Sequence, residues 1–360
     1  MKNRIGIVTG GGDCPGLNAV IRAVAKAAAK RSWETLGFLG GFEGLLEPRR
    51  FLELDYKAIS GLLLRGGTIL GTANRGKFSA KTGHGESRQL PRELLDETKA
   101  GFEAMGLRGL VSIGGDGSLS ITQMLFEHGI PIVGVPKTID NDLEGTLFTF
   151  GFDSAVACAT DALDRLQTTA ESHNRVMVLE LMGRYAGWIA LFAGVSGGAD
   201  VILIPEIPFH YDSVCEKIRE RESQGKKYTV IVVAEGAREK EGEFVTSAGQ
   251  EAYREARLGG VGTVVAAEVE KRTGKETRVC VLGHLQRGGS PTPFDRALCS
   301  MFGAYAVELI AAGDFGKMVG WQGAQIGAVN ISDAVGRLKT VRPDGNLVQT
   351  ARALGVSLGD

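Results

Sequence analysis

The stretch Gly10-Gly11-Gly12-Asp13-Cys14-Pro15-Gly16-Leu17-Asn18 decides the fold class, because it joins an apolar run to a helical pattern. The preceding run Ile5–Val8 has the character of a buried strand, and the following Leu17–Lys30 has the length and composition of a helix. Glycines at such a turn let backbone N–H groups close on an anion. The stretch therefore predicts a strand–loop–helix unit whose loop can hold phosphate.

Two further loops follow short apolar runs, and each combines acidic residues with glycine or lysine. Gly114-Gly115-Asp116-Gly117-Ser118 follows the run Gly109–Ile113, and Pro136-Lys137-Thr138-Ile139-Asp140-Asn141-Asp142 follows Ile132–Val135. Because ligands of parallel sheets lie at the carboxyl ends of strands, we expect all three loops at one such edge. Phosphate-cradling glycines and carboxylates that hold a cation or accept a proton are what phosphoryl transfer needs.

The remaining chain continues to alternate apolar runs with helical stretches. The further predicted strands are Val176–Leu179, Val201–Ile204, Thr229–Val233 and Val279–Leu282, and the further predicted helices are Asp153–Ser172, Tyr211–Gln224 and Gly262–Thr273. This alternation predicts an α/β fold with two Rossmann-like lobes, each a mostly parallel sheet covered by helices. A length of 360 residues suits two lobes, and we place the start of the second near Gly151.

Charge and cysteine content exclude several classes of function. With 41 basic and 42 acidic side chains the net charge is -1, so no global field attracts nucleic acid or a membrane surface. The five cysteines are widely spaced and form no C-x-x-C pair, which argues against a disulfide framework or a zinc site. The N-terminal residues carry no long apolar segment. We therefore expect a soluble, cytoplasmic protein.

The acidic residues of the second and third loops are candidate cation ligands and proton acceptors. Asp116 can bind Mg²⁺ directly or through water, and Ser118 is placed to begin the next helix as its N-cap. Asp140 and Asp142 are two positions apart, so in an extended segment both face one cavity. One could serve as general base while the other organises metal-bound water.

The first loop is less specific when it is taken alone. An ordinary tight turn explains its glycines equally well, and their spacing is neither a dinucleotide-binding fingerprint nor a Walker A loop.

The second half of the chain supplies cationic groups at predicted strand and helix boundaries, namely Arg175, Arg184, Arg278, His284 and Arg287. A lone arginine is usually a solvated surface group. Guanidinium forks also match phosphate oxygens, and glycines beside several of these residues let a ligand approach. In a protein of nearly neutral charge, we interpret the set as an anion site.

In order and spacing these motifs closely resemble those of the 6-phosphofructokinases, over nearly the whole chain. The motifs that carry the resemblance are Gly11-Gly12-Asp13, Gly114–Ser118, Pro136–Asp142, Met182–Tyr185 and Gly283–Ser290. The resemblance implies transfer of a phosphoryl group from ATP to the 1-hydroxyl of fructose 6-phosphate in glycolysis, with Mg²⁺ on the donor phosphates. It also implies an active site in the cleft between the lobes, and a homo-oligomer, a tetramer or dimer, whose subunits share active sites.

The resemblance assigns roles to the matching positions. Asp140 becomes the general base and Asp116 the Mg²⁺ ligand, while Thr138 and Arg184 steady the transferring group. The positions implied for the donor are Gly12, Arg75, Gly115, Asp116, Gly117 and Ser118. Those implied for the sugar phosphate are Thr138, Ile139, Asp140, Met182, Gly183, Arg184, Glu235, His284, Leu285, Gln286 and Arg287, joined by Arg175 and Arg278 from a neighbouring subunit.

The resemblance also divides the chain. Residues 1–150 form the larger, donor-binding lobe, completed by about 275–325, whereas 151–274 form the smaller lobe for fructose 6-phosphate and 326–360 a C-terminal extension. Arg22 and Lys26 match cationic positions of an effector site in regulated bacterial enzymes, but Tyr56 stands where another arginine is expected.

Gly117 and Lys137 bear on the choice of donor. Members of the family that use pyrophosphate typically carry aspartate where this chain has Gly117 and lysine where it has Lys137, whereas ATP users usually have glycine at both positions. Because aspartate at 117 would crowd and repel the α-phosphate of ATP, we favour ATP and keep pyrophosphate as the alternative. A non-catalytic sugar-phosphate sensor is disfavoured because Asp116 and Asp140 are both present. A dinucleotide dehydrogenase is disfavoured by Asp13 and the missing fingerprint.

Overall fold

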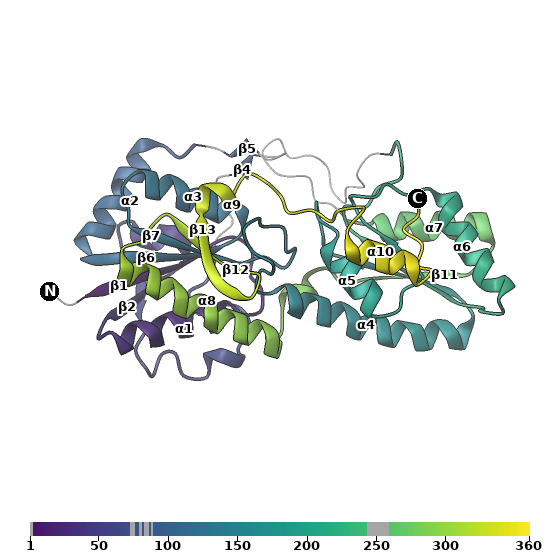
Figure 1. Cartoon of the computed structure of the whole chain (residues 1–360), viewed down its shortest axis with the longest axis horizontal. Helices are drawn as coiled ribbons and strands as arrows, with labels where there is room; N and C mark the ends of the chain where they lie inside the picture. Colours follow the sequence, from purple (N-terminus) through teal and green to yellow (C-terminus); the bar gives the residue numbers. More distant parts are fainter. Residues whose placement is uncertain (1–2, 73–75, 79–80, 83–85, 88, 243–258) are drawn as a thin grey trace. The chain divides into compact units, whose positions relative to one another are not determined.

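The structure is a computed structural model whose described part divides into two compact units (Figure 1). The described residues are 3–72, 76–78, 81–82, 86–87, 89–242 and 259–360. Unit 1 comprises Met1–Ile139, Leu143–Ser154 and Arg287–Leu338, and unit 2 comprises Asp140–Asp142, Ala155–Gln286 and Lys339–Asp360. Residues 275–286 thus fall in unit 2, and the stretch 326–360 is divided between the units.

Unit 1 is built on a seven-stranded sheet of order β13-β12-β7-β6-β1-β2-β3. Its strands are β1 (Arg4–Thr9), β2 (Glu34–Phe38), β3 (Phe51–Glu53), β6 (Leu107–Gly114), β7 (Ile132–Pro136), β12 (Lys317–Gln322) and β13 (Gln325–Asn330). The inner pairs are parallel, and β3 and β13 add antiparallel edges. Strands β1, β6 and β7 are almost wholly buried, as a parallel sheet covered on both faces requires.

Helices cover both faces of this sheet (Figure 1). The helices of unit 1 are α1 (Leu17–Lys30), α2 (Arg92–Ala104), α3 (Asp116–Glu127), α8 (Pro293–Ala312) and α9 (Ile331–Ala334), with short 3-10 turns η1 (Gly41–Leu45) and η2 (Leu62–Leu64). Helices α1 and α8 pack together so closely that a Cβ on Gly303 would lie 2.6 Å from the Cβ of Ala23. On the opposite face, Leu94 and Phe102 of α2 and Leu125 of α3 join one core cluster. A two-stranded hairpin, β4 (Lys81–Thr82) with β5 (Glu86–Ser87), completes the unit.

Unit 2 contains an all-parallel sheet of order β11-β8-β10-β9. Its strands are β8 (Val176–Leu181), β9 (Val201–Leu203), β10 (Thr229–Ala234) and β11 (Thr277–Val281), and its helices are α4 (Phe152–His173), α5 (Trp188–Ser196), α6 (Tyr211–Ser223), α7 (Val261–Thr273) and α10 (Asn346–Ala353). Helix α4 begins in the last residues of unit 1 and continues in unit 2. The two mostly parallel sheets confirm the predicted α/β class.

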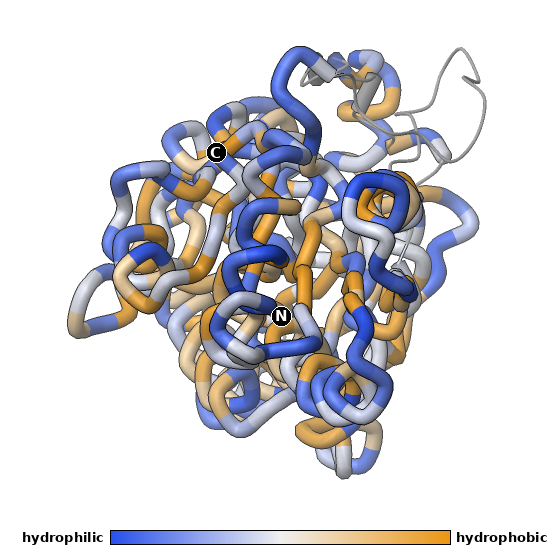
Figure 2. The backbone as a smooth tube through the Cα atoms, turned by 90° about the vertical axis from the view of Figure 1, so that its right-hand side faces the viewer, coloured by the Kyte–Doolittle hydropathy of each residue, from blue (hydrophilic) through white to orange (hydrophobic). Residues whose placement is uncertain are grey.

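The hydropathy of the chain follows this layering. Hydrophobic segments run through the interior while hydrophilic turns lie outside (Figure 2). The core of unit 2 is largely aliphatic, and four of its members, Val178, Leu203, Val233 and Val265, are fully buried. Burial of these side chains between the sheet and its helices is the main favourable contribution to the stability of the unit.

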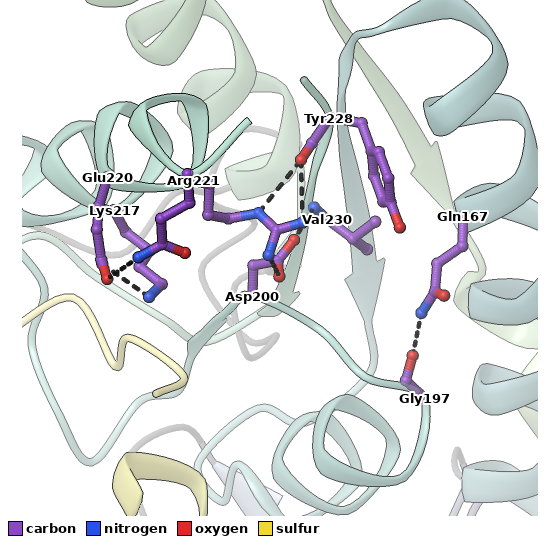
Figure 3. A network of polar contacts seen from close by, with 9 residues as sticks. Gln167, Gly197, Asp200, Lys217, Glu220, Arg221, Tyr228 and Val230 are labelled. Carbon is purple, nitrogen blue, oxygen red and sulfur yellow. Dashed lines mark hydrogen bonds and ion pairs between the residues drawn. The ribbon is translucent and has the colours of Figure 1, made fainter. Parts of the chain in front are cut away.

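A polar network fixes the end of α6 against the sheet of unit 2 (Figure 3). Asp200, just before β9, accepts a hydrogen bond from the Val230 N–H at 2.9 Å and pairs with Arg221 of α6, Nη1 to Oδ1, at 2.5 Å. Arg221 also donates from Nε and Nη2 to the Tyr228 carbonyl oxygen, each at 3.2 Å. Burial raises the pKa of Asp200, although the Val230 N–H and the Arg221 charge oppose this.

Candidate functional site

The first two loops and the start of the third meet in unit 1. The Lys137 ammonium donates to the Gly12 carbonyl oxygen, and the Lys137 N–H donates to the Gly114 carbonyl oxygen at 2.9 Å. A Cβ on Gly10 would lie 2.5 Å from the Ser118 Oγ, and one on Gly114 would overlap the Ser118 Cβ. Glycine at position 10 therefore lets the first loop approach the second this closely, and glycine at position 114 leaves room for Ser118 within the second loop.

Helix α3, which the second loop opens, begins three residues earlier than it would if Ser118 were its N-cap. The helix begins at Asp116 with Gly115 as its N-cap, so the prediction that Ser118 is the N-cap is wrong. The buried Ser118 side chain instead packs beneath Gly10 and Gly114. The first N–H groups of α3 lie beside the glycine loops, which favours an anion there.

Asp116 is the acidic residue of this loop, and it is only partly buried. Its Oδ1 accepts a hydrogen bond from the Gly336 N–H at 3.2 Å. Within the described ranges no group of three or more His, Cys, Asp or Glu side chains could hold a metal ion. A single carboxylate fits Mg²⁺, since that ion commonly takes most of its ligands from substrate phosphates and water.

The third loop turns where an extended segment was expected. Asn141 has φ 52°, a left-handed conformation that asparagine tolerates, so the argument that strand alternation turns Asp140 and Asp142 to one side is wrong. In unit 2, Lys339 holds this turn: its Nζ donates to the Asn141 Oδ1 at 2.9 Å and its N–H donates to the Asp142 carbonyl oxygen at 3.0 Å.

The start of the third loop is held within unit 1. Thr149 Oγ1 donates to the Thr138 carbonyl oxygen at 2.7 Å, and Lys137 forms a parallel bridge with Phe150. Ile139, the next predicted site residue, is buried. The returning segment 149–150 thus runs beside the residues that precede Asp140.

The predicted sugar residues Met182, Gly183, Arg184 and Glu235 follow the neighbouring strands β8 and β10 of unit 2. The Glu235 N–H donates to the Leu181 carbonyl oxygen at 2.8 Å, and the Gly236 N–H donates to the Gly183 carbonyl oxygen at 3.2 Å. The two strand ends therefore place these residues side by side, as the rule for parallel sheets predicts.

The remaining predicted site residues lie in two places, beside Glu276 and in a 3-10 turn. Arg175 and Arg278 contact the same Oε1 of Glu276, at 3.1 Å and 2.5 Å, so they form one cationic pair in unit 2. His284 and Leu285 are exposed in a 3-10 turn, η3 (Gly283–Arg287).

Gln286 and Arg287 of the same turn make hydrogen bonds to backbone carbonyl oxygens. Gln286 is fully buried, and its Nε2 donates to the Gly283 carbonyl oxygen at 3.2 Å. In unit 1, Arg287 donates to the carbonyl oxygen of Asp13 at 3.2 Å, beside Gly12. Arg75 lies outside the described residues.

Sequence reasoning missed two polar residues that hold these loops. Lys339 is separated from Asn141 by 198 positions, and no local motif marks it. Thr72 Oγ1 donates to the Gly11 carbonyl oxygen at 2.5 Å. The position of Thr72 directly after Leu70-Gly71 could have indicated this contact, because the hydroxyl group of a threonine at a turn often forms a hydrogen bond with nearby backbone.

A separate cavity of about 840 Å³ lies along α1 in unit 1. Arg22, Lys26 and Lys30 line it together with Trp33 and Tyr56, and the Lys26 Nζ lies 5.5 Å from the centre of the Tyr56 ring. The two residues matched to an effector site thus face a single hollow.

Two further findings concern the helices and the cysteines. No helix in the described ranges combines the length and apolar character needed to cross a bilayer. The cysteines Cys14, Cys158, Cys215, Cys280 and Cys299 are all free thiols.

Comparison with known proteins gives a consistent family. The family model described as Phosphofructokinase matches residues 4–310. The ATP-dependent 6-phosphofructokinase of Chloroflexus aurantiacus is 54% identical over 360 residues, which cover 100% of this chain and 98% of that protein.

Solved structures agree on the fold. The phosphofructokinase of Saccharomyces cerevisiae superposes with a TM-score of 0.79 at 30% identity over 92% of this chain, and the match spans 45% of the yeast chain, less than half its length. A pyrophosphate-dependent phosphofructokinase from Nitrosospira multiformis has a TM-score of 0.80 at 24% identity, covering 100% of this chain and 93% of that one. The second likeness concerns the fold alone.

Proposed function

Because this chain belongs to the phosphofructokinase family, we propose that it transfers the γ-phosphoryl group of ATP to the 1-hydroxyl of fructose 6-phosphate. The products are fructose 1,6-bisphosphate and ADP, as in glycolysis. The observation that carries the proposal is that the first two loops converge in unit 1 with the start of the third, where Lys137 is bonded to Gly12 and Ser118 packs beneath Gly10.

We assign the donor to the loops of unit 1. Gly12 and the start of α3 from Gly115 to Ser118 offer backbone N–H groups to phosphate oxygens, and the Lys137 ammonium lies next to them. Asp116 is the residue that would hold Mg²⁺, which when bound neutralises charge on the donor phosphates. The backbone N–H groups are fixed by the geometry of the loop and the helix, so they need little reorganisation during transfer.

We assign the acceptor chemistry to residues of unit 2. Asp140 accepts the proton of the attacking hydroxyl, which makes that oxygen a better nucleophile. Met182, Gly183, Arg184 and Glu235 lie together at adjacent strand ends, a suitable place to bind the sugar. Arginine carries charge and a planar fork, so Arg184 is suited to steady phosphoryl oxygens, as Thr138 is from unit 1.

The donor follows from Gly117. Glycine there, at the second position of α3, leaves room for the rest of a nucleoside triphosphate, whereas an aspartate would add a carboxylate beside its α-phosphate. The named relative at 54% identity is ATP-dependent. Pyrophosphate is the less supported alternative.

We further propose Mg²⁺ as the required ion, a homo-oligomer in which Arg175 and Arg278 serve a neighbouring subunit, and action in the cytoplasm. Free thiols at all five cysteines favour a reducing compartment. The cationic hollow lined by Arg22 and Lys26 suits a regulatory anion.

An assay of turnover tests the proposal. The chain is incubated with fructose 6-phosphate, Mg²⁺ and either ATP or pyrophosphate, and formation of fructose 1,6-bisphosphate is followed by coupling to aldolase. We expect turnover with ATP. Absence of turnover with both donors would contradict the kinase assignment, and faster turnover with pyrophosphate would reverse the choice of donor.

A further inference from the structure

Helices α4 and α8 begin beside each other in unit 1, and their first turns are joined by a buried carboxylate. Asp295, in the first turn of α8, is fully buried. Its Oδ1 accepts the Gly151 N–H at 3.0 Å, and its Oδ2 accepts the Ser154 N–H at 2.9 Å and the Ser154 hydroxyl at 2.6 Å. The carboxylate therefore satisfies N–H groups at the start of α4 that have no partner within that helix.

The capping is reciprocal. Thr292, the N-cap of α8, accepts the Asp295 N–H at 3.2 Å and donates its hydroxyl hydrogen to Asp153 Oδ2 of α4 at 2.5 Å. The Thr292 N–H donates in turn to the Ser154 Oγ at 3.1 Å. Each helix thus supplies an acid to the other, and the two starts form a closed set of hydrogen bonds.

This set continues into the loops assigned to the reaction. Gly151 follows Phe150, which pairs with Lys137, and Thr149 bonds the Thr138 carbonyl oxygen. Gly151 has φ +93°, and a Cβ there would lie 2.7 Å from the Cys14 Sγ, so its backbone is packed against the first glycine loop. A shift of Gly151 would therefore move both Lys137 and the backbone beside Thr138.

Resting on the proposed function, we propose that Asp295 is a positioning residue for phosphoryl transfer. Its ionised carboxylate holds Gly151 and the first turn of α4, and through them the turn at Lys137 and Thr138. The ionised form is required because all three groups bonded to the Asp295 carboxylate are donors. A neutral carboxyl group would direct its own O–H toward one of these donors.

Burial raises the pKa of Asp295 to about 6, against the opposing effect of the bonds from Ser154 and Gly151. The titratable groups that face it are Asp153 of α4, Cys14 of the first loop and Cys299 of α8. Burial raises the pKa of both thiols, that of Cys14 to about 12, so both stay neutral and Asp153 supplies the neighbouring charge. Protonation of Asp295 on mild acidification then releases the cap and lowers turnover.

Steady-state kinetics of Asp295→Asn across pH 5 to 8.5 test the role, with the folded fraction of each variant measured by circular dichroism. Asparagine keeps the shape but turns an N–H₂ toward one donor, so the loop is misplaced at every pH. We expect kcat at neutral pH to fall on the order of 10–100-fold, with KM for fructose 6-phosphate changed less than about threefold. The acid limb of kcat near the pKa of Asp295, about 6, should also disappear.

Ser154→Ala is the second variant, in case Asp295→Asn does not fold. It removes one hydrogen bond that lowers the pKa of Asp295, so the acid limb should move to higher pH. Asp161→Asn is the matched control: it makes the same chemical change on α4 at an exposed position, and its pH profile should superimpose on the wild type.

An acid limb that stays in place in Ser154→Ala, or in a folded Asp295→Asn, would overturn the role of Asp295 while leaving the kinase assignment intact. A wild-type protein without turnover would instead contradict the proposed function, and the positioning role with it.

Discussion

Replacement of Gly151 by alanine tests the packing that joins the first and third loops. Gly151 has φ +93°, and a Cβ there would lie 2.7 Å from the Cys14 Sγ and 2.8 Å from its Cβ. The left-handed backbone costs an L-residue about 1–2 kcal/mol, while loss of glycine freedom in the unfolded chain returns about 0.4–1 kcal/mol. Overpacking against Cys14, which is fully buried and cannot move away, adds about 1–3 kcal/mol.

The net loss in the free energy of unfolding is therefore about 2–4 kcal/mol, which lowers Tm by roughly 4–16 °C in a domain of this size. Differential scanning calorimetry of the variant measures it. Gly106→Ala is the matched control, because Gly106 also has positive φ, +61°, but nothing lies within 4 Å of an added Cβ. It should lose only about 1 kcal/mol. Equal losses of unfolding free energy in the two variants would refute the claim that contact with Cys14 requires glycine at position 151.

Three further predictions concern the reaction. Asp140→Ala should lower kcat by about 10²–10⁴-fold while KM for fructose 6-phosphate stays within a few-fold, because a base acts on the chemical step; an unchanged kcat in the coupled assay would exclude that role. Gly117→Asp should lower kcat/KM for ATP more than for pyrophosphate, and equal losses with both donors would show that the crowding argument is wrong. Lys137→Met removes the charged donor to the Gly12 carbonyl oxygen, so KM for ATP should rise about 10–100-fold. A KM for ATP that does not change would mean that this bond does not hold the donor loop.

The strands that end at glycine-rich loops could be predicted from the sequence, because a sharp change from apolar residues to glycine marks where each ends. Helix α1 spans the predicted Leu17–Lys30, and β7 extends the predicted run by one residue. Edge strands were missed for the opposite reason. All three residues of β3 are exposed, so its sequence carries no apolar signal.

Tertiary contacts account for what local patterns could not predict. Aspartate is rarely buried, and nothing near Asp295 in the sequence announces that its partners are Gly151 and Ser154, more than 140 positions away. The left-handed turn at Asn141 likewise depends on Lys339, from the far end of the chain. Residue identity alone could nominate Asp140 and Asp142, but not the direction of their side chains.

A competition between donors tests the central claim most directly. The chain is mixed with fructose 6-phosphate, Mg²⁺ and equal concentrations of ATP and pyrophosphate, and ³¹P NMR follows every phosphorus resonance in one tube. We predict that the γ-phosphorus signal of ATP declines as the 1-phosphate signal of fructose 1,6-bisphosphate grows, while pyrophosphate persists. Consumption of pyrophosphate with ATP intact, or no new sugar phosphate at all, would contradict the account.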